Sequence, residues 1–525
     1  MRKKIGKINI FLQARLNSDR LPYKSLIKLN QIPLVVLCAK RLCGENVDVT
    51  VLTSKEKSDE YLVDVLRQNK INFFRGSLNN VYKRFYDCAK KLNNDDVIIR
   101  ATADNPFVNY DFVVNTLKVF LKNNEVYMGI DHGKHNLPYG MSVEIFRKSL
   151  LMKYKKKIDK RTMEHVTPNF YKYANTEIVK KNKLSKDFSN LSCTLDNFDD
   201  YKKINHIFHK YKDPTKVSWQ RLVFKLNEFK ANKEINLKKT KFIIGGAQVG
   251  NQYSNFKELN IGKIFKKKII NENFTIIDTA KNYHDSHKKI SAIQSKKKIN
   301  IITKLNYSTS LSHKYPTENF YLNFYEILTI LKRNKIDTLL IHTFSDFKKN
   351  NSEILKIFNK LKSLKLLKNY GVSIYQPKEL MFLMTNFSKL VIQFPINFID
   401  YRWLKIDILK LKKKSKSVLI GRSIFLRGKL LKKEGYIKNR NVNILFKNQL
   451  NAIKKKYNIS SNLELCIMYV NSLNFLDHII FGFENFFQIK KIIKYKDKKF
   501  LTGVAKKINQ KFEFLNIKYI DLLKL

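Results

Sequence analysis

A chain of 525 residues is too long for one ordinary hydrophobic core, so two domains are expected. A hydrophobic content of 44%, with 12% aromatic residues, favours packed globular domains over disorder. The net charge of +58 would suit nucleic-acid binding, but most of the 102 basic residues are lysines spread along the whole chain and arginine is scarce. Nucleic-acid binding is therefore an unfavoured alternative.

The cysteine count and the hydropathy pattern indicate the cellular compartment in which the protein is expected. Five dispersed cysteines are too few for a disulfide framework or a zinc site, which fits a reducing cytoplasm. The apolar stretch Ile8–Leu12 is too short for a signal peptide and is interrupted by Asn9. No run approaches the roughly 18 apolar residues of a membrane span. A cytoplasmic protein without a membrane span is expected.

The first half of the chain alternates short apolar runs with segments of helical periodicity. Helices are predicted at Asp59–Asn69 and Asn80–Leu92. This order predicts an open, doubly wound, Rossmann-like α/β sheet, in which ligands bind at the carboxyl ends of the strands. We place this domain at residues 1–230, with a lysine-rich boundary at 227–240. The predicted strands are Ile8–Ala14, Val47–Thr53, Ile71–Phe74, Val97–Ala101, Val126–Ile130, Ser142–Phe146 and Cys193–Leu195.

A basic loop follows the first predicted strand, in the segment Gln13–Lys24. Arg15, Arg20 and Lys24 gather there with Ser18. Cationic side chains after a first strand can hold a triphosphate, although the glycines of a phosphate-binding loop are missing here.

Two carboxylates follow later strands of the same half. Asp104 comes after Val97–Ala101, and Asp196 comes after Cys193–Leu195. Magnesium on a nucleotide is usually held by one or two carboxylates and by phosphate oxygens, so we predict a metal role for both. The alternative is that each carboxylate only caps a helix N-terminus.

The second half of the chain shows eight short apolar runs separated by helical segments, such as Glu353–Leu367. Eight β/α repeats predict a (β/α)₈ TIM barrel, which we place at residues 241–525. The predicted strands are Phe242–Ala247, Thr275–Thr279, Asn300–Lys304, Thr338–His342, Tyr370–Ile374, Val391–Phe394, Val418–Arg422 and Ile479–Gly482.

Four polar residues fall at or just beyond the carboxyl ends of successive barrel strands, where barrel active sites lie. They are Asp278, Tyr283, Lys304 and His342. A lysine ammonium beside a tyrosine favours the phenolate, a carboxylate anchors the lysine, and a histidine can orient a substrate oxygen. This set suits protonation of a carbonyl oxygen as hydride reaches its carbon. Each residue alone would more often be structural, but the joint placement predicts catalysis.

The first half resembles a cytidylyltransferase-like family named for spore-coat polysaccharide biosynthesis, related to acylneuraminate cytidylyltransferases. The matching segments begin at Gln13, Phe74, Arg100, Pro138, Glu164 and Thr194. The resemblance implies a nucleotidyltransferase fold, and CMP transfer from CTP with Mg²⁺ at Asp104 and Asp196. It implies catalytic roles for Arg15 and Lys24. It also implies nucleotide or substrate binding by Gln13, Ala14, Ser18, Arg20, Arg75, Arg100, Glu144 and His165.

The second half resembles the aldo/keto reductases over roughly residues 241–495. The resemblance implies that Tyr283 is the general acid, that Lys304 and Asp278 tune it, and that His342 orients the carbonyl. NADPH, or NADH, would bind at Ser373, Gln393, Arg422, Gly482, Asn485 and Gln488. Two positions depart from the family pattern, because Ile374 replaces a frequent asparagine and Arg422 replaces a frequent aromatic residue.

Together the two halves predict a bifunctional enzyme of surface polysaccharide or nucleotide-sugar biosynthesis. Its expected partners are CTP, a sugar or sugar acid, and NAD(P)H. The departures at Ile374 and Arg422 motivate an alternative, in which the barrel is a non-catalytic binding module beside an active nucleotidyltransferase. Whether the protein forms a homodimer is left open by the sequence.

Overall fold

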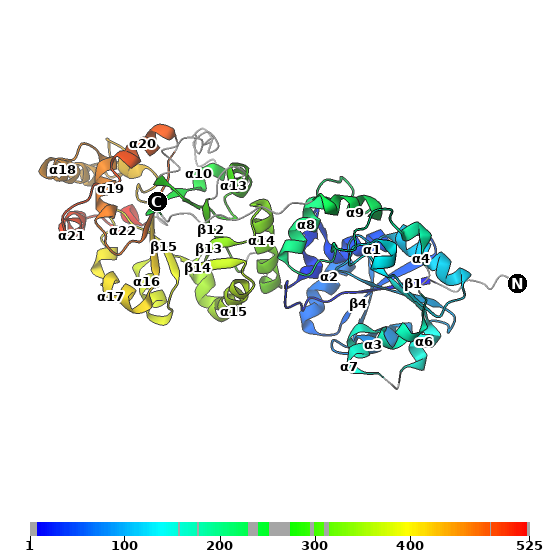
Figure 1. Ribbon diagram of the computed structural model, residues 1–525. Coiled ribbons are helices and arrows are strands. Elements are labelled where there is room, and N and C mark those ends of the chain that lie inside the picture. Colours follow the sequence, from blue (N-terminus) through cyan, green and yellow to red (C-terminus); the bar gives the residue numbers. More distant parts are fainter. Residues whose placement is uncertain are drawn as a thin grey trace. The chain divides into compact units, whose positions relative to one another are not determined.

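The computed structural model describes residues 8–155, 158–175, 178–228, 240–250, 273–294, 299–308, 314–483 and 485–521. The chain divides into two compact units, Met1–Asn232 and Lys233–Leu525 (Figure 1). The predicted boundary at 227–240 lies largely outside the described residues. In the part of the chain that the structure describes, no helix is both long and apolar enough to cross a membrane.

The first unit is built on a seven-stranded sheet of order β5-β4-β1-β6-β8-β7-β9. Its first four strands are mutually parallel, and β8 enters antiparallel to β6 and to β7. The chain leaves the central strand β1 towards β4 on one side and later returns to β6 on the other. The strands are β1 (Ile8–Gln13), β4 (Val47–Ser54), β5 (Asn72–Gly76), β6 (Val97–Thr102), β7 (Tyr127–Gly129), β8 (Glu144–Arg147) and β9 (Ala174–Asn175), with a small hairpin of β2 (Lys28–Leu29) and β3 (Ile32–Pro33).

Helices cover both faces of this sheet. Figure 1 shows α1, α4, α8 and α9 on one face, and α3, α6 and α7 on the other. The helices are α1 (Leu34–Leu42), α2 (Glu60–Gln68), α3 (Val81–Ala89), α4 (Tyr110–Lys122), α5 (His132–His135), α6 (Lys148–Lys153), α7 (Lys160–His165), α8 (Phe198–Phe208) and α9 (Trp219–Asn227).

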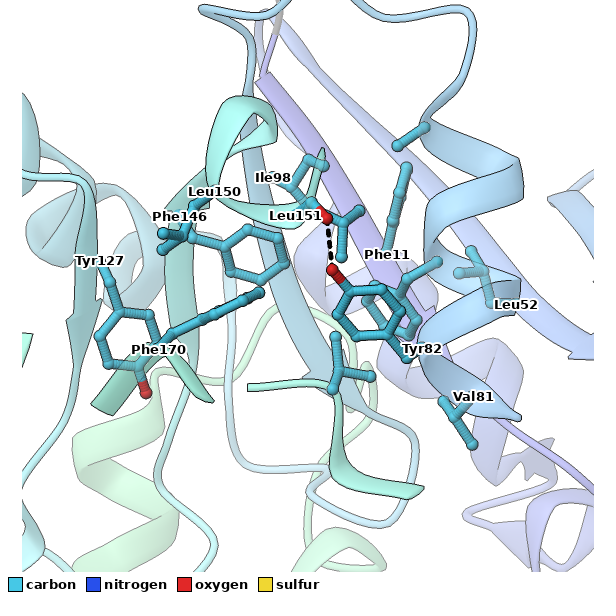
Figure 2. Close-up of a cluster of buried hydrophobic side chains, with 13 residues drawn as sticks. Phe11, Leu52, Val81, Tyr82, Ile98, Tyr127, Phe146, Leu150, Leu151 and Phe170 are labelled. Atoms are coloured by element: carbon cyan, nitrogen blue, oxygen red, sulfur yellow. Dashed lines mark hydrogen bonds between the residues drawn. The ribbon is translucent and has the colours of Figure 1, made fainter. Parts of the chain in front are cut away.

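An aromatic core holds α3 and α6 against the sheet (Figure 2). Phe11 of β1 meets Phe85 of α3 edge-on, with ring centroids 5.6 Å apart. The hydroxyl of Tyr82 donates a hydrogen bond to the carbonyl of Leu151, so this buried polar group is satisfied (Figure 2). Each buried aromatic ring removes about 150–250 Å² from water, which makes this cluster a main support of β1.

The second unit is a closed barrel of eight strands, joined in chain order from β10 to β17. All the neighbouring pairs are parallel, including the closing pair of β10 and β17. The strands are β10 (Phe242–Gly245), β11 (Ile276–Asp278), β12 (Asn300–Leu305), β13 (Ile336–Ile341), β14 (Leu367–Ser373), β15 (Val391–Pro395), β16 (Val418–Arg422) and β17 (His478–Phe481). The predicted fold class is thus confirmed for both halves.

Branched aliphatic side chains form a buried cluster in the barrel, including Ile243, Ile302, Leu340 and Ile420. Barrel interiors are filled in this way, so the functional groups are left to the carboxyl ends of the strands. The helices of this unit are α10 (Ala247–Gly250), α13 (Ser286–Gln294), α14 (Pro316–Ile330), α15 (Phe344–Ser363), α16 (Pro377–Asn386), α17 (Ile408–Ser415), α18 (Arg440–Lys456), α19 (Asn462–Asn471), α20 (Phe486–Lys494), α21 (Val504–Gln510) and α22 (Ile517–Ile520).

Two predicted elements differ from the structure. The helix expected at Glu353–Leu367 is α15, which starts at Phe344 and ends at Ser363. Lys365 turns the chain at a φ of +59°, and Leu367 already begins β14. The predicted helix ran too far because the spacing of apolar residues continues across this turn into the next strand, which is also apolar. The strand expected at Cys193–Leu195 is wrong, since these residues form no strand and the isolated bridge beside them joins Ser192 to Tyr139.

Two candidate active sites

The first candidate site lies where β4 and β6 flank β1. Chain connections leave β1 in opposite directions there, and such a switch point opens a crevice at the carboxyl ends of the strands. Backbone hydrogen bonds join the strand ends, from Ala14 to Leu52 at 3.1 Å and from Ala103 to Gln13 at 3.0 Å. The basic loop after β1 and the Asp104 loop after β6 therefore start side by side.

Lys24 brings the two predicted metal carboxylates together. Its Nζ lies 2.8 Å from Oδ2 of Asp104, 3.1 Å from Oδ1 of Asp196 and 3.2 Å from the carbonyl of Leu195. Arg20 reaches the same Asp196 oxygen at 2.9 Å. Burial disfavours the charged form of Asp104, but the Lys24 ammonium outweighs it and holds the pKa of Asp104 below its usual value.

Neither carboxylate is a helix cap. The caps of α4 and α8 are Asn109 and Asn197, whose side chains accept backbone hydrogen bonds from the first turns. The alternative interpretation of Asp104 and Asp196 therefore does not hold, and both carboxylates face a cation.

Asp104 and Asp196 could supply some, but not all, of the ligands of a divalent cation. Among the described residues, no group of three or more His, Cys, Asp or Glu side chains could hold a metal ion. The carboxylates of Asp104 and Asp196 converge on the Lys24 ammonium, and Asp196 also pairs with Arg20, so both carboxylates already have a cationic partner. The remaining ligands would have to be phosphate or water oxygens, as magnesium commonly requires.

A hydrogen-bonded chain holds the loop that carries Asp104. Oγ1 of Thr194 donates to Oδ1 of Asn105 at 2.9 Å, and Nδ2 of Asn105 donates to Oγ1 of Thr102 at 2.9 Å. Gly140 closes over this chain at a φ of +100°, and a Cβ there would lie 2.4 Å from Oγ1 of Thr194. Only glycine fits at this position.

A second polar group lies on the neighbouring strands. Arg100 pairs with Glu144 and donates a 3.3 Å hydrogen bond to Oε1 of Gln13. Glu144 also accepts from the hydroxyls of Tyr127, at 2.8 Å, and Thr167, at 2.5 Å. The structure therefore connects three sequence-predicted binding residues, and the Arg100 hydrogen bond orients the Gln13 amide.

Other predicted residues lie apart from this group. Arg75 pairs with Glu60 at 2.7 Å and donates to the carbonyl of Ser54 at 3.0 Å, which ties β5 to α2. The His165 ring is exposed at the end of α7 and makes no hydrogen bond within the described residues. Arg15 is exposed, Ser18 is partly buried, and Ala14 is buried.

Asp59 is a residue that the sequence patterns missed. It is fully buried and accepts hydrogen bonds from the Leu16 amide at 2.7 Å, the Thr53 hydroxyl at 3.0 Å and the Ser54 amide at 3.1 Å. It therefore anchors the start of the basic loop to the end of β4. In the sequence it stands directly before a helix, where aspartate is common, so no signal distinguished it.

The second candidate site lies at the carboxyl end of the barrel and is built on a buried ion pair. The side chains of Lys304 and Asp278 are only 2% and 7% exposed. Nζ of Lys304 lies 2.7 Å from each carboxylate oxygen and 3.0 Å from the Thr279 carbonyl. Burial lowers the pKa of Lys304, while Asp278 opposes that shift.

Tyr283 and His342 complete this group. Nζ of Lys304 lies 5.4 Å from the centroid of the Tyr283 ring, and the rings of Tyr283 and His342 meet edge-on with centroids 6.2 Å apart. Burial, Lys304 and Arg422 lower the pKa of His342 to about 4. His342 is therefore neutral near pH 7, and the four residues predicted to act together do lie together.

Two of the residues predicted to hold the nicotinamide, Gln393 and Ser373, are buried on neighbouring strands. Nε2 of Gln393 donates to Asp278 at 2.8 Å, while its buried Oε1 has no hydrogen-bond partner among the described residues. Ser373 is also buried, at the end of the neighbouring strand β14. An orphaned buried acceptor beside a hydroxyl fits a carboxamide, which carries N–H donors and a carbonyl.

At the β17 end of the barrel, two of the residues predicted to bind the cofactor lie at the start of α20. Asn485 caps α20 by accepting from the Gln488 amide at 3.0 Å. Gly482, just after β17, is exposed. A helix N-terminus at a barrel rim suits an anion such as a cofactor phosphate, although the Asn485 oxygen already occupies one amide.

Family models match two parts of the chain. A model of the cytidylyltransferase family matches residues 10–268, and a model of the aldo/keto reductase family matches residues 241–513. An uncharacterized protein of Methanocaldococcus jannaschii is 35% identical over 172 residues, which cover 32% of this chain and 69% of that protein.

Solved structures resemble each unit separately. A cytidylyltransferase from Leptospira borgpetersenii is 26% identical, with a TM-score of 0.38, over 42% of this chain and 94% of its own. A glycerol dehydrogenase from Gluconobacter oxydans is 19% identical, with a TM-score of 0.44, over 54% of this chain and 93% of its own. An aldo-keto reductase from Bacillus halodurans is 17% identical, with a TM-score of 0.42, over 52% and 91%.

Proposed function

Because this chain belongs to the aldo/keto reductase family over residues 241–513 and a cytidylyltransferase family model matches residues 10–268, we propose that it is one enzyme with two activities. The first is transfer of CMP from CTP to a sugar or sugar acid. The second is NAD(P)H-dependent reduction of a carbonyl group. The observation that carries the second is the contact of Tyr283, Lys304, Asp278 and His342 in one site.

In the transferase, a sugar hydroxyl oxygen attacks the α-phosphorus of CTP and its proton is released to water, the bond to the bridging oxygen of the β-phosphate breaks, and pyrophosphate leaves. Lys24, Arg20 and Arg15 bind the phosphates and neutralise charge on the transferring group. Mg²⁺ held by Asp104 and Asp196 would supply further charge neutralisation. Lys24 already sits between the two carboxylates, which supports a shared role in this chemistry.

In the reductase, NAD(P)H bound at Ser373 and Gln393 would supply a hydride, with its two electrons, to the carbonyl carbon. Tyr283 gives its hydroxyl proton to the carbonyl oxygen, so that an alcohol forms. The Lys304 ammonium near the ring stabilises the resulting phenolate, and Asp278 holds the ammonium in place. Neutral His342 can donate a hydrogen bond to the carbonyl oxygen without competing for that proton. Ser373 and Gln393 would bind the carboxamide of the nicotinamide.

A common pathway explains why the two activities share one chain. A sugar that is reduced and then activated with CMP would be a precursor of a surface polysaccharide or another glycoconjugate. A second candidate function keeps the transferase active and makes the barrel a binding module. Arg422 favours this candidate, because a cation stands at the end of β16 where the family often has an aromatic residue.

One experiment tests both activities in the intact protein. With CTP, Mg²⁺ and a panel of sugar acids, pyrophosphate release should appear and should vanish in Asp104→Asn. With NADPH and a panel of aldehydes and ketones, cofactor oxidation should appear in the same preparation. NADPH fluorescence decides between the reductase and the binding module, because a scaffold would show no saturable cofactor binding.

A further inference from the structure

Arg422 is held rigidly at the end of β16. Nη2 donates a 3.0 Å hydrogen bond to the carbonyl of Ile374, and Nη1 lies 3.3 Å from the Ser423 hydroxyl. The guanidinium stacks over the Tyr375 ring, with Cζ 4.3 Å from the ring centroid. The segment just after β14 thus fixes the plane of the guanidinium, because a cation over an aromatic face is attracted to it.

The charge of Arg422 has no acidic counterpart among the residues that the structure describes. Both of its hydrogen bonds go to neutral oxygens, and it takes part in no ion pair there. A partly buried cation is normally paired with a carboxylate. The ammonium of Lys304, by contrast, does have an acidic partner, because it is paired with Asp278. The Arg422 guanidinium therefore carries a positive charge that no carboxylate among the described residues compensates.

This charge lies close to the reacting atoms rather than at a remote cofactor phosphate. Arg422 contributes to lowering the pKa of both Lys304 and His342. Its hydrogen bond to Ile374 also places it beside Ser373, where the nicotinamide carboxamide is expected. A group bound by Arg422 would therefore lie near the carbonyl that receives the hydride.

We propose that Arg422 binds an oxyanion of the reductase substrate, so that the barrel acts on carbonyl compounds that carry a carboxylate or a phosphate. This inference rests on the proposed reductase function. The planar guanidinium offers parallel N–H donors, which suit both oxyanions and hold the substrate in one orientation. A carboxylated sugar would meet the requirement of this site and could also serve the transferase.

Paired substrates test the proposal. The kcat/KM values of wild type, Arg422→Gln and Arg422→Lys are compared for butanal against succinic semialdehyde, and for glyceraldehyde against glyceraldehyde 3-phosphate. The wild type should prefer one anionic member, which identifies carboxylate or phosphate. In Arg422→Gln the ratio of kcat/KM for that substrate to kcat/KM for its neutral partner should fall about ten- to hundredfold, as expected for one charge-assisted hydrogen bond. Arg422→Lys should keep part of the preference.

Arg440→Gln is the matched control, because it removes the same charge from an exposed position at the start of α18. It should behave as wild type. An equal loss on neutral and anionic substrates in Arg422→Gln, with a raised KM for NADPH, would overturn the proposal in favour of a cofactor role. A wild type without any preference would overturn it as well.

Calorimetry gives a readout that does not need turnover. Oxalate and inorganic phosphate are titrated into wild type, Arg422→Gln and Arg440→Gln in the presence of NADPH. At least one anion should bind saturably, and only Arg422→Gln should lose it. Absence of anion binding while NADPH still binds refutes the role of Arg422 alone, whereas absence of NADPH binding refutes the proposed reductase itself.

Discussion

Lys304 and Asp278 form a bidentate ion pair inside the barrel, with Nζ at 2.7 Å from both carboxylate oxygens. Their strands, β11 and β12, are direct neighbours, so the pair bridges the floor of the reductase site. Removing one partner leaves a buried charge uncompensated, which makes this pair a sensitive point of both stability and catalysis.

We expect Asp278→Asn to lower the free energy of unfolding of the barrel by about 3–5 kcal/mol, the usual cost of breaking a buried pair from one side. Urea denaturation measures this change. The matched control is Glu326→Gln, whose carboxylate is 56% exposed and pairs with Lys281 at the surface. It should cost about 0–1 kcal/mol. Similar losses in the two variants would show that Lys304 tolerates the missing charge.

Tyr283→Phe should lower the rate of carbonyl reduction by about 10²–10⁴, because it removes the proton donor and keeps the ring. NADPH binding and pyrophosphate release should not change. Tyr307→Phe is the control, since its hydroxyl lies 2.8 Å from Thr317 and takes no part in the group of four. Reduction at the wild-type rate in Tyr283→Phe would remove the general-acid assignment.

The barrel should lose stability as the pH falls from about 6.5 to 4. Burial is the largest cause that lowers the pKa of His287 and of His342 to about 4, and nearby lysines add to it. Unfolding returns these side chains to an ordinary pKa of about 6.5. The unfolded state therefore binds more protons in this window, and acid favours unfolding.

Urea midpoints at pH 7.5, 6 and 5 would measure this dependence. The double variant His287→Gln, His342→Gln should have a flatter profile over the same range. An unchanged slope in the double variant would assign the acid sensitivity to other groups. Reduction by the wild type should show no histidine titration near pH 6.5, since His342 is already neutral there.

Lys24→Met should lower pyrophosphate release by about 10²–10³, the usual effect of removing one charge-stabilising donor. It should also tighten Mg²⁺ binding in the absence of nucleotide, because Asp104 and Asp196 lose the ammonium between them. Calorimetry with MgCl₂ measures the second effect. Lys28→Met, at an exposed position on the same segment, is the control. Transfer within threefold of wild type would exclude Lys24 from the chemistry.

Asp59→Asn should destabilise the first unit by about 1–3 kcal/mol, because the amide cannot accept all the hydrogen bonds that reach this buried carboxylate. It should also raise the KM for CTP, since the loop from Leu16 carries the phosphate-binding cations. Asp64→Asn on the neighbouring helix α2 should leave both values near wild type, because Asp64 pairs with an exposed arginine. A normal KM for CTP in Asp59→Asn would limit Asp59 to stability.

Much of the fold follows from local sequence patterns. The period of apolar residues located each barrel strand, because an inward-facing strand is apolar over several residues. The same apolar pattern placed Asp278, Lys304 and His342 at the ends of successive strands. Because parallel strands bring their carboxyl ends to one rim of the barrel, these residues were expected to lie close together. The end of α15 at Ser363 was missed because it depends on a single left-handed residue, Lys365, that no pattern reveals.

By itself, the sequence determined two α/β units, the strands that carry chemistry and the residue types at their ends. Only the tertiary structure decided which charges meet. Lys24 binds two carboxylates from segments 80 and 172 residues away, buried Asp59 holds a loop 43 residues away, and Arg422 has no acidic partner among the described residues. The reason is physical: residue type and periodicity are local, whereas the pairing and desolvation of a charge depend on side chains that only folding brings within a few ångströms.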